Sequence, residues 1–153
     1  MNLEKLEVLQ KCEMFRALDD AQLQVVEKMC THKVFELGEI IYKQDKIVDK
    51  LYVIGEGLVA IILEVGPLAQ RQVQAAANFE VLGWSAMIAP HLSTATIKAL
   101  EKTKVLVFNG QELRDLCLTY PEIGCRVSRG VARVIATRLR HAYTQLLGVT
   151  SQD

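Results

Sequence analysis

The chain has 153 residues, of which 50% are hydrophobic, 24% charged and 6% aromatic. These proportions are typical of a globular domain, and they exclude a disordered chain, a collagen-like repeat and a low-complexity scaffold. Eighteen lysines and arginines balance eighteen aspartates and glutamates, so the formal net charge is zero. A chain without excess positive charge lacks the electrostatic footprint of an autonomous nucleic-acid binder. The length predicts a single domain, residues 1–153.

No targeting or membrane segment is evident in the sequence. Glu4 and Glu7 interrupt the apolar pattern of the N-terminus, which excludes a signal peptide. The longest apolar runs, such as residues 58–63, are far too short to span a membrane. We therefore expect a soluble, cytoplasmic protein that does not bind membranes. The cysteines are Cys12, Cys30, Cys117 and Cys125. Their spacings match no metal or iron–sulfur pattern, so we expect reduced thiols and no metal site.

Residues 1–31 show the apolar periodicity of helices. Leu3, Leu6 and Leu9 share one apolar side, and a second periodic run follows Asp19. The carboxylate of Asp19 can accept the free amide hydrogens of a first helical turn, so we expect it to be an N-cap.

Residues 32–108 change to short runs of β-branched and aromatic residues. Turn signals such as residues 37–39, 55–57 and 66–68 separate these runs. Short strands with frequent turns are typical of a sandwich or barrel, and the pattern predicts about eight strands.

Residues 109–148 return to helical periodicity. Asn109 can cap a short helix, and Pro121 fits the first turn of a longer one. An apolar stripe from Val127 to Leu146 predicts a helix of about 25 residues, or about 37 Å. One small β-domain cannot cover so long a helix, which favours a homodimer through it in the manner of a coiled coil. The alternative is a helix that folds back over its own barrel.

Two segments resemble the cyclic-nucleotide-binding domain shared by the catabolite activator protein, Fnr-type regulators, protein kinase A regulatory subunits and gated channels. In residues 35–61, Gly38 and Glu39 mark a turn, Asp49 precedes a β-rich run, and Gly57 precedes another. Residues 82–108 lie where that family has its phosphate-binding cassette. The resemblance covers nearly the whole chain. It implies a mainly β fold, a double-stranded β-helix or jelly roll, with an N-terminal helical segment and a long C-terminal helix.

The cassette of that family is a short helix after a Gly-Glu pair, followed by an Arg-Ser/Thr-Ala motif. The glutamate binds the ribose 2′-hydroxyl, the arginine binds the cyclic phosphate, and helix amides face the same anion. Here Gly83, Thr94 and Ala95 match, but Trp84 replaces the glutamate and Ser93 replaces the arginine. Losing two charged hydrogen bonds would weaken nucleotide binding by about 3–6 kcal/mol, or two to four powers of ten.

The candidate ligand-binding residues of this divergent cassette are Gly83, Trp84, Ser85, Ala86, Ser93, Thr94 and Ala95, together with Arg138 of the long helix. Backbone amides near Ser85 and Ala86 and the nearby hydroxyls are candidate contacts for a small anion. Trp84 either fills the volume of the sugar or stacks on another flat ligand, such as a haem or an aromatic acid. Arg138 falls on the inward stripe. It is either the replacement cation of the pocket or a side chain that pairs with an acid or reaches water.

One histidine and one further arginine stand near the candidate site. His91, between the two halves of the cassette, is either a haem or metal ligand or a solvated polar residue. Arg71, at the start of a predicted strand, is either a second pocket cation or a solvated strand end. Neither pattern implies a bound cofactor, so we expect none.

These observations favour a non-catalytic regulatory or sensor module that does not bind cAMP or cGMP in the usual way. Its partners would be a small-molecule anion or nucleotide-like ligand, a second copy of the chain and a protein. One alternative is a cyclic-nucleotide-binding signalling domain despite the divergent cassette, and another is a ligand-free dimeric interaction module. The sequence has no GxSxG, HExxH or P-loop motif, so we expect no enzyme. It has no recognition-helix segment after the long helix, so we expect no autonomous DNA binding.

Overall fold

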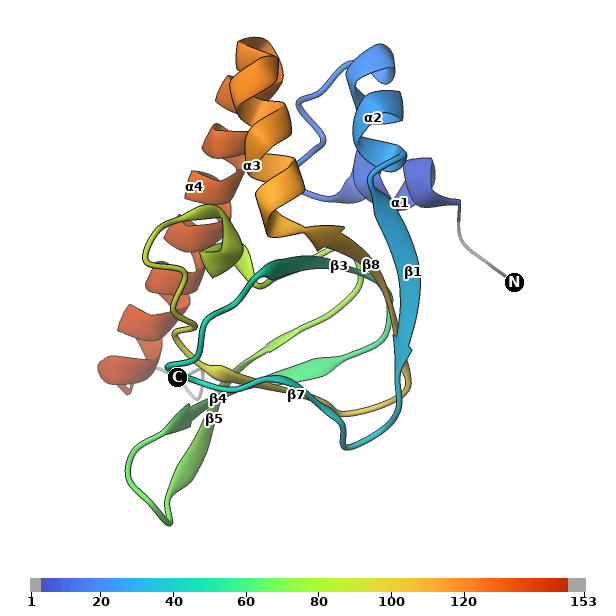
Figure 1. Cartoon of the computed structure of the whole chain (residues 1–153). Coiled ribbons are helices and arrows are strands. Elements are labelled where there is room, and N and C mark those ends of the chain that lie inside the picture. Colours follow the sequence, from blue (N-terminus) through green and yellow to red (C-terminus); the bar gives the residue numbers. More distant parts are fainter. Residues whose placement is uncertain (1–3, 149–153) are drawn as a thin grey trace.

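The computed structural model describes residues 4–148 and has two four-stranded antiparallel sheets at its centre (Figure 1). The strands are β1 (Cys30–Phe35), β2 (Ile40–Tyr42), β3 (Lys50–Glu56), β4 (Val59–Glu64), β5 (Gln70–Ala76), β6 (Val81–Leu82), β7 (Thr96–Ala99) and β8 (Thr103–Asn109). Their order is β1-β8-β3-β6 in one sheet and β2-β7-β4-β5 in the other. This roll, with helices before and after it, confirms the predicted fold class.

Helices flank the roll at both ends of the described chain. They are α1 (Lys5–Lys11), α2 (Asp20–Glu27), α3 (Gly110–Thr119) and α4 (Pro121–Leu146), and a 3₁₀ helix, η1 (Trp84–Met87), separates β6 from β7. Within residues 4–148, none of these helices combines the length and the apolar character needed to cross a membrane.

The predicted helix starts are confirmed by their capping groups. The Asp19 carboxylate accepts the Gln22 amide hydrogen at 2.8 Å, and the Gln22 side chain accepts the Asp19 amide hydrogen at 3.0 Å, which completes a capping box. Asn109 accepts the amide hydrogen of Glu112 at 3.0 Å. Pro121 is the first residue of α4, where its missing amide hydrogen costs nothing.

The first strand of the roll begins two residues before the boundary expected from the sequence. Strand β1 begins at Cys30, which pairs with Phe108, and Thr31 pairs with Val107. Residues 12–18 form turns between α1 and α2. Ladder pairing with β8 supplies the strand stability that the polar composition of this segment does not suggest.

Strand β3 is buried on both of its faces, so it carries the roll and the helical layer together. Its alternate residues Leu51 and Val53 pack into a core shared with the helices. The residues between them, Tyr52 and Ile54, pack into the core between the two sheets. Successive side chains of a strand point to opposite faces, and a strand covered on both faces therefore reads as a continuous apolar run.

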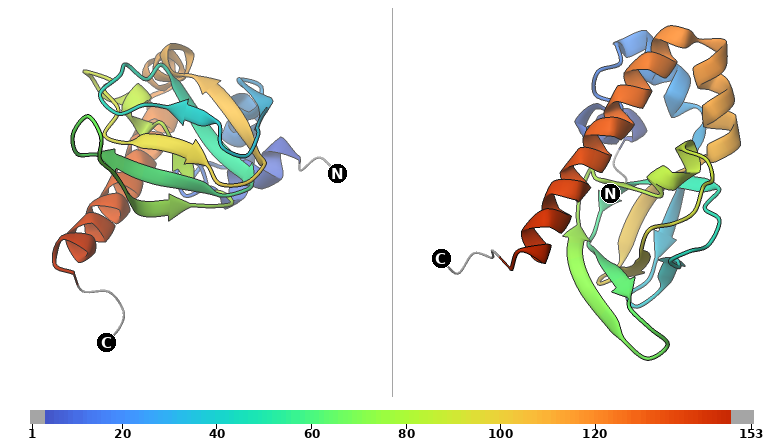
Figure 2. Two further views of the ribbon diagram at one scale, coloured as in Figure 1. Left: turned by 90° about the horizontal axis from the view of Figure 1, so that it is seen from below. Right: turned by 90° about the vertical axis from the view of Figure 1, so that its left-hand side faces the viewer.

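Helix α4 is 26 residues long, close to the predicted length, and it changes its surroundings along the way. Val127, Val131 and Val134 in its first half are buried in the helical core. Its second half runs past the side of the roll toward the β4–β5 hairpin (Figure 2). There Leu139, Tyr143 and Leu146 are exposed. The apolar stripe is therefore core in one half of the helix and surface in the other.

Gly130 lets α4 approach the turn segment that follows α1. A Cβ at this position would collide with the carbonyl oxygen of Met14. In an open helix, alanine is more favourable than glycine by about 1 kcal/mol. Here we expect the opposite sign for Gly130→Ala, a loss of about 1–3 kcal/mol in the free energy of unfolding, because overpacking displaces the helix. Urea denaturation measures it. Ser128→Ala, at an exposed position of α4, is the control and should change stability by less than about 0.5 kcal/mol. A stabilised Gly130→Ala protein would contradict this packing.

Candidate functional site

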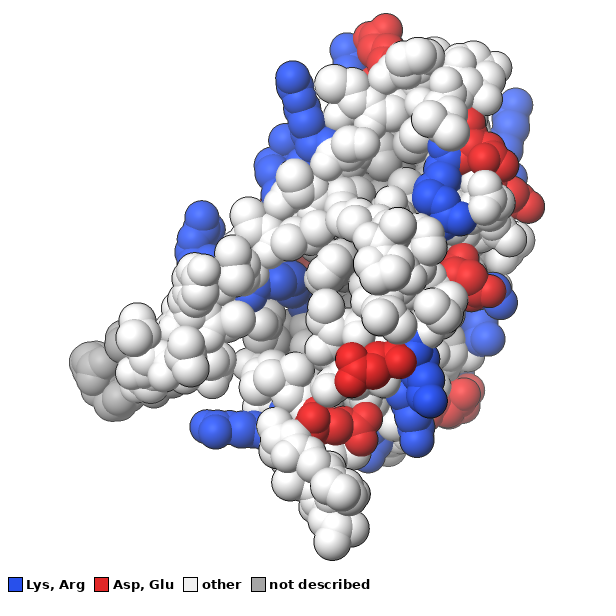
Figure 3. All heavy atoms as spheres, turned by 60° about the vertical axis from the view of Figure 1, so that its left-hand side comes forward, with Lys and Arg blue, Asp and Glu red and all other residues white. Residues whose placement is uncertain are grey.

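A cavity of about 310 Å³ lies between α4 and the mouth of the roll. The space-filling view shows this hollow beside α4, with basic atoms inside it (Figure 3). The residues that line it are Tyr42, Ile61, Leu63, Val73, Gln74, Val81, Leu82, Trp84, Thr94, Ala95, Ile97, Ile135, Arg138, Leu139 and Ala142. The lining is thus mainly apolar. Among the described residues that form it, Arg138 is the one that carries a charge.

The cassette is attached to the roll through Gly83 and Tyr42. Gly83 has φ 76° and ψ 27°, the left-handed conformation that glycine adopts without strain, and a Cβ there would lie 2.5 Å from the carbonyl oxygen of Lys50. Its amide hydrogen is donated to the Tyr42 hydroxyl at 3.0 Å. Burial raises the pKa of Tyr42 to about 12, so the hydroxyl stays protonated at neutral pH. Gly83 therefore joins the cassette to the roll without lining the cavity itself.

Four of the eight sequence-predicted site residues line the cavity. Trp84, Thr94, Ala95 and Arg138 meet there, although Arg138 comes from an element more than forty residues away in sequence. Gly83, Ser85, Ala86 and Ser93 lie outside the lining.

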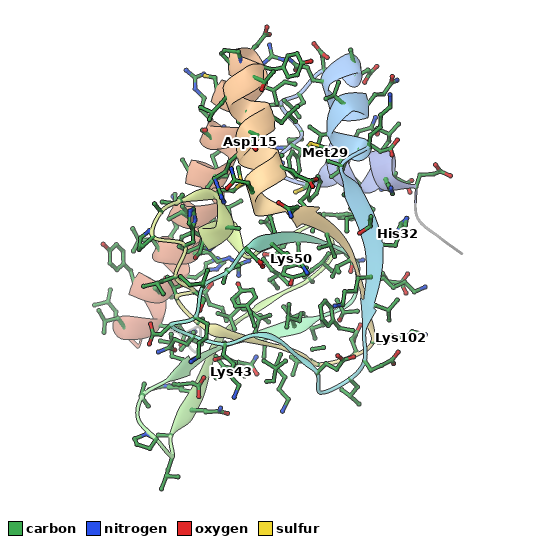
Figure 4. The ribbon with its side chains drawn as sticks, viewed as in Figure 1. Met29, His32, Lys43, Lys50, Lys102 and Asp115 are labelled. Carbon is green, nitrogen blue, oxygen red and sulfur yellow. The ribbon has the colours of Figure 1, made fainter. Side chains whose placement is uncertain are left out.

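Ser93, which stands where the family has its arginine, has a structural role. It is only 3% exposed, and its hydroxyl donates to the carbonyl oxygen of Lys43 while accepting the amide hydrogen of Lys46 at 3.1 Å. Lys43 follows β2 at the end of the roll from which the β4–β5 hairpin projects (Figure 4). These two hydrogen bonds fasten the loop after β2 to the cassette.

Some backbone groups of the short helix η1 also form hydrogen bonds within the protein. The amide hydrogen of Ala86 is donated to the carbonyl oxygen of Gly83 at 2.9 Å, and the carbonyl oxygen of Ala86 accepts from Arg114. His91 Nδ1 lies 2.9 Å from the carbonyl oxygen of Ser85. A carbonyl can only accept, so Nδ1 carries the proton of this hydrogen bond. Among residues 4–148, no group of three or more His, Cys, Asp or Glu side chains is placed to hold a metal ion.

Arg138 is held at the cavity by hydrogen bonds to the roll. Its Nη2 donates to the carbonyl oxygen of Val81 at 2.8 Å, and its own carbonyl oxygen accepts from Gln74 Nε2 at 3.2 Å. Burial lowers the pKa of Arg138, and the nearby Glu80 opposes that shift. No carboxylate of the described chain forms a salt bridge with it. The guanidinium stays charged at neutral pH, since arginine is not deprotonated in proteins.

Sequence reasoning missed most of the cavity wall. Ile61 and Leu63 of β4 face the cavity because they are two residues apart and so share one side of the strand. No sequence pattern marked Tyr42 or Gln74 as part of a site. Their roles depend on partners 41 and 64 residues away in the chain.

A family profile described as "Cyclic nucleotide-binding domain" matches residues 32–120. The chain belongs to this family. The profile covers the roll, the cassette and α3, and the family is a regulatory one. The resemblance stated from the sequence is thereby confirmed. Within residues 4–148, the roll and its flanking helices leave no segment for a DNA-binding domain.

Known proteins extend the match beyond the profile. A Rhodopseudomonas palustris protein named for a potassium channel is 25% identical over 116 residues, which is 76% of this chain but 28% of that protein. The chain thus spans little more than a quarter of that relative. A crystallised Geobacter metallireducens protein named for cyclic nucleotide binding is 25% identical with TM-score 0.76, over 91% of this chain and 99% of that one. A cyclic nucleotide-binding domain of Methylobacillus flagellatus has TM-score 0.82 at 19% identity, over 98% and 84% of the two chains, and it shows the shared fold.

The hydrogen bond between Tyr42 and Gly83 gives a stability prediction. Tyr42→Phe keeps the ring but leaves the buried Gly83 amide hydrogen without its acceptor, so we expect a loss of about 1–3 kcal/mol in the free energy of unfolding. Urea denaturation measures the change. Tyr120→Phe, which removes the same hydroxyl from an exposed ring, is the matched control and should have little effect. Equal stabilities of the two variants would show that the Tyr42 hydroxyl does not secure the cassette.

Proposed function

We propose that this chain is a non-catalytic regulatory module that senses a small molecule in the cavity beside Trp84. It would do so without the glutamate and arginine contacts by which the family usually binds a cyclic nucleotide. The observation that carries the proposal is the open cavity of about 310 Å³. Ligand pockets range from about 300 to 1,000 Å³ and are mostly apolar with a few polar groups, and this cavity matches that description. Trp84 forms a wall of the cavity and leaves this space open. The ligand-free alternative would be better supported by a filled pocket.

The divergent cassette argues against the family's usual mode of nucleotide binding. Trp84 has no carboxylate for a ribose hydroxyl, and the Ser93 hydroxyl is already bonded to the backbone at Lys43 and Lys46. A cyclic nucleotide in this cavity would have Arg138 as its one charged partner from the described lining. Cyclic-nucleotide signalling despite the divergence remains the first alternative, and binding measurements decide between the two.

A ligand in this cavity would touch two parts of the fold at once. Ile135, Arg138 and Leu139 belong to α4, whereas Ile61, Trp84 and Ala95 belong to the roll and its cassette. A ligand shifts a conformational equilibrium by the difference in its affinity for the two states. A ligand that bridges α4 and the roll would favour the state in which the helix lies against the cavity. This is a regulatory output that requires no catalytic group.

The sole tryptophan of the chain makes the proposal directly testable. Trp84 lines the cavity, so its fluorescence should respond to an occupant. We expect dissociation constants above about 100 μM for cAMP and cGMP, because both charged side chains of the family's usual cassette are missing. Fluorescence titration and calorimetry measure the affinity, with AMP as a linear control. Native mass spectrometry of freshly purified protein reports any small molecule that remains bound. Submicromolar binding of cAMP would establish the first alternative instead.

The exposed face of α4 supports a homodimer, and with it a second alternative, a dimeric interaction module that has no ligand. Leu139, Tyr143 and Leu146 follow one another at intervals of four and three residues and are all exposed. Residues at this spacing lie on one side of a helix and can pack against an identical helix.

A charge on this face should separate the protomers. We expect sedimentation to show a dimer for the natural sequence and a monomer for Leu146→Glu, since a carboxylate in an apolar helix seam is costly. Leu118→Glu is a closely matched control, because Leu118 is 81% exposed on α3 and Leu146 is 82% exposed on α4. Loss of the dimer in both variants, or in neither, would contradict a seam along α4.

A further inference from the structure

We infer that the ligand of this cavity is an organic acid with an apolar body and one anionic group, and that Arg138 binds the anionic group. The inference rests on the proposed sensor function, because it names the ligand class for the same site. It is carried by the contrast between a mainly apolar wall and the single cation within the described lining.

The wall favours an apolar body. Ile61 and Leu63 of β4, Val73 of β5, and Ile135 and Leu139 of α4 contribute branched aliphatic side chains from three elements. An apolar group that enters such a cavity gains about 25 cal/mol for each Å² of surface removed from water. A ligand rich in hydroxyl groups and ring nitrogens would lose hydration there with few partners in return.

Two neutral polar side chains of the wall have partners within the protein. The Tyr42 hydroxyl accepts the Gly83 amide hydrogen. Gln74 Nε2 donates to the carbonyl oxygen of Arg138, and Gln74 Oε1 lies 3.4 Å from His141 Nδ1. The wall thus offers a ligand a few neutral groups, among them the Thr94 hydroxyl and the Trp84 indole N–H, and Arg138 is the one charged side chain of the described lining.

Arg138 has donors to spare and no carboxylate partner in the described chain. A guanidinium has five N–H donors, and Nη2 uses one of them on the carbonyl oxygen of Val81. Glu80 lies near enough to act on the pKa of Arg138, but its carboxylate accepts the amide hydrogen of Ala77 at 2.8 Å and forms no salt bridge with Arg138. A partly buried cation in this state is stabilised by one anionic ligand group, through charge-assisted hydrogen bonds.

The cavity size sets the scale of the probe. At about 30 Å³ for each water-sized group, a cavity of about 310 Å³ holds roughly ten such groups. Octanoate has about ten non-hydrogen atoms, a flexible apolar chain and one carboxylate, which makes it a suitable probe for a cavity of this size. Octan-1-ol keeps the chain and removes the charge, and hexanoate keeps the charge and shortens the chain.

The test is titration of the full chain with octanoate, octan-1-ol and hexanoate at neutral pH, followed by Trp84 fluorescence and calorimetry. We expect saturable binding of one octanoate per protomer. Octanoate should bind about tenfold to a hundredfold more tightly than octan-1-ol, which is the effect of one charged hydrogen-bonded pair. It should bind about fifteenfold more tightly than hexanoate, since each of the two additional buried methylenes contributes about fourfold.

Three variants assign the charge preference to one side chain. Arg138→Gln should abolish the preference for octanoate over octan-1-ol, and Arg138→Lys, which keeps the charge and serves as a folding check, should retain it. Arg133→Gln removes the same charge from an exposed position of α4 and should leave both affinities unchanged. Equal affinity for octanoate and octan-1-ol, or a preference that survives Arg138→Gln, overturns the inference while leaving a ligand-sensing cavity in place. No response to these probes or to cAMP, with no co-purified molecule in the native mass spectrum, overturns the proposed function as well.

Discussion

The candidate site depends on how closely α4 can approach the N-terminal segment. At Gly130 the helix lies against the backbone of Met14, and at Gly124 it lies against the backbone of Cys117, with no room for a Cβ at either position. Between and beside these glycines, Val127 and Val131 are buried in the helical core. The first half of α4 is therefore fixed in position and direction. Arg138 lies about two turns beyond Gly130 and is carried to the mouth of the roll by this rigid packing.

The second half of α4 is held by a different kind of contact. Where the helix passes the roll, the Arg138 guanidinium donates to the carbonyl oxygen of Val81, and the Gln74 side chain donates to the carbonyl oxygen of Arg138. Gln74 Oε1 also lies 3.4 Å from His141 Nδ1. The mainly apolar side chains that line this region leave a cavity of about 310 Å³ between the helix and the roll. A helix anchored firmly at one end and more loosely at the other is suited to respond to what occupies the space beneath it.

The sequence predicted best those features whose causes are local. Asp19, Asn109 and Pro121 act within one helical turn, and their roles were correctly read from neighbouring residues. Arg138 was placed on the inward stripe by helical spacing alone. Its acceptor was beyond prediction, because the carbonyl oxygen of Val81 is 57 residues away and reaches Arg138 only through the complete fold.

The cassette shows a second limit of sequence reasoning. The motif comparison identified two substitutions, at Trp84 and at Ser93, and treated both as losses from a ligand site. The structure separates them, because Trp84 is part of the cavity wall whereas Ser93 is buried behind it and bonded to the backbone. The sequence alone does not show whether a serine hydroxyl contacts a ligand or bonds to the protein backbone. The difference lies in whether Lys43 and Lys46 are brought within its reach.

These two substitutions also move the charge of the site from one element to another. In the family's usual cassette the phosphate-binding cation belongs to the roll. Here the one cation of the described lining belongs to α4 itself. An anionic ligand would then act on the helix through a charge-assisted contact with the guanidinium donors that the Val81 carbonyl leaves free. The free energy of this contact would then depend directly on the position of α4, because the anion would bind a side chain of that helix.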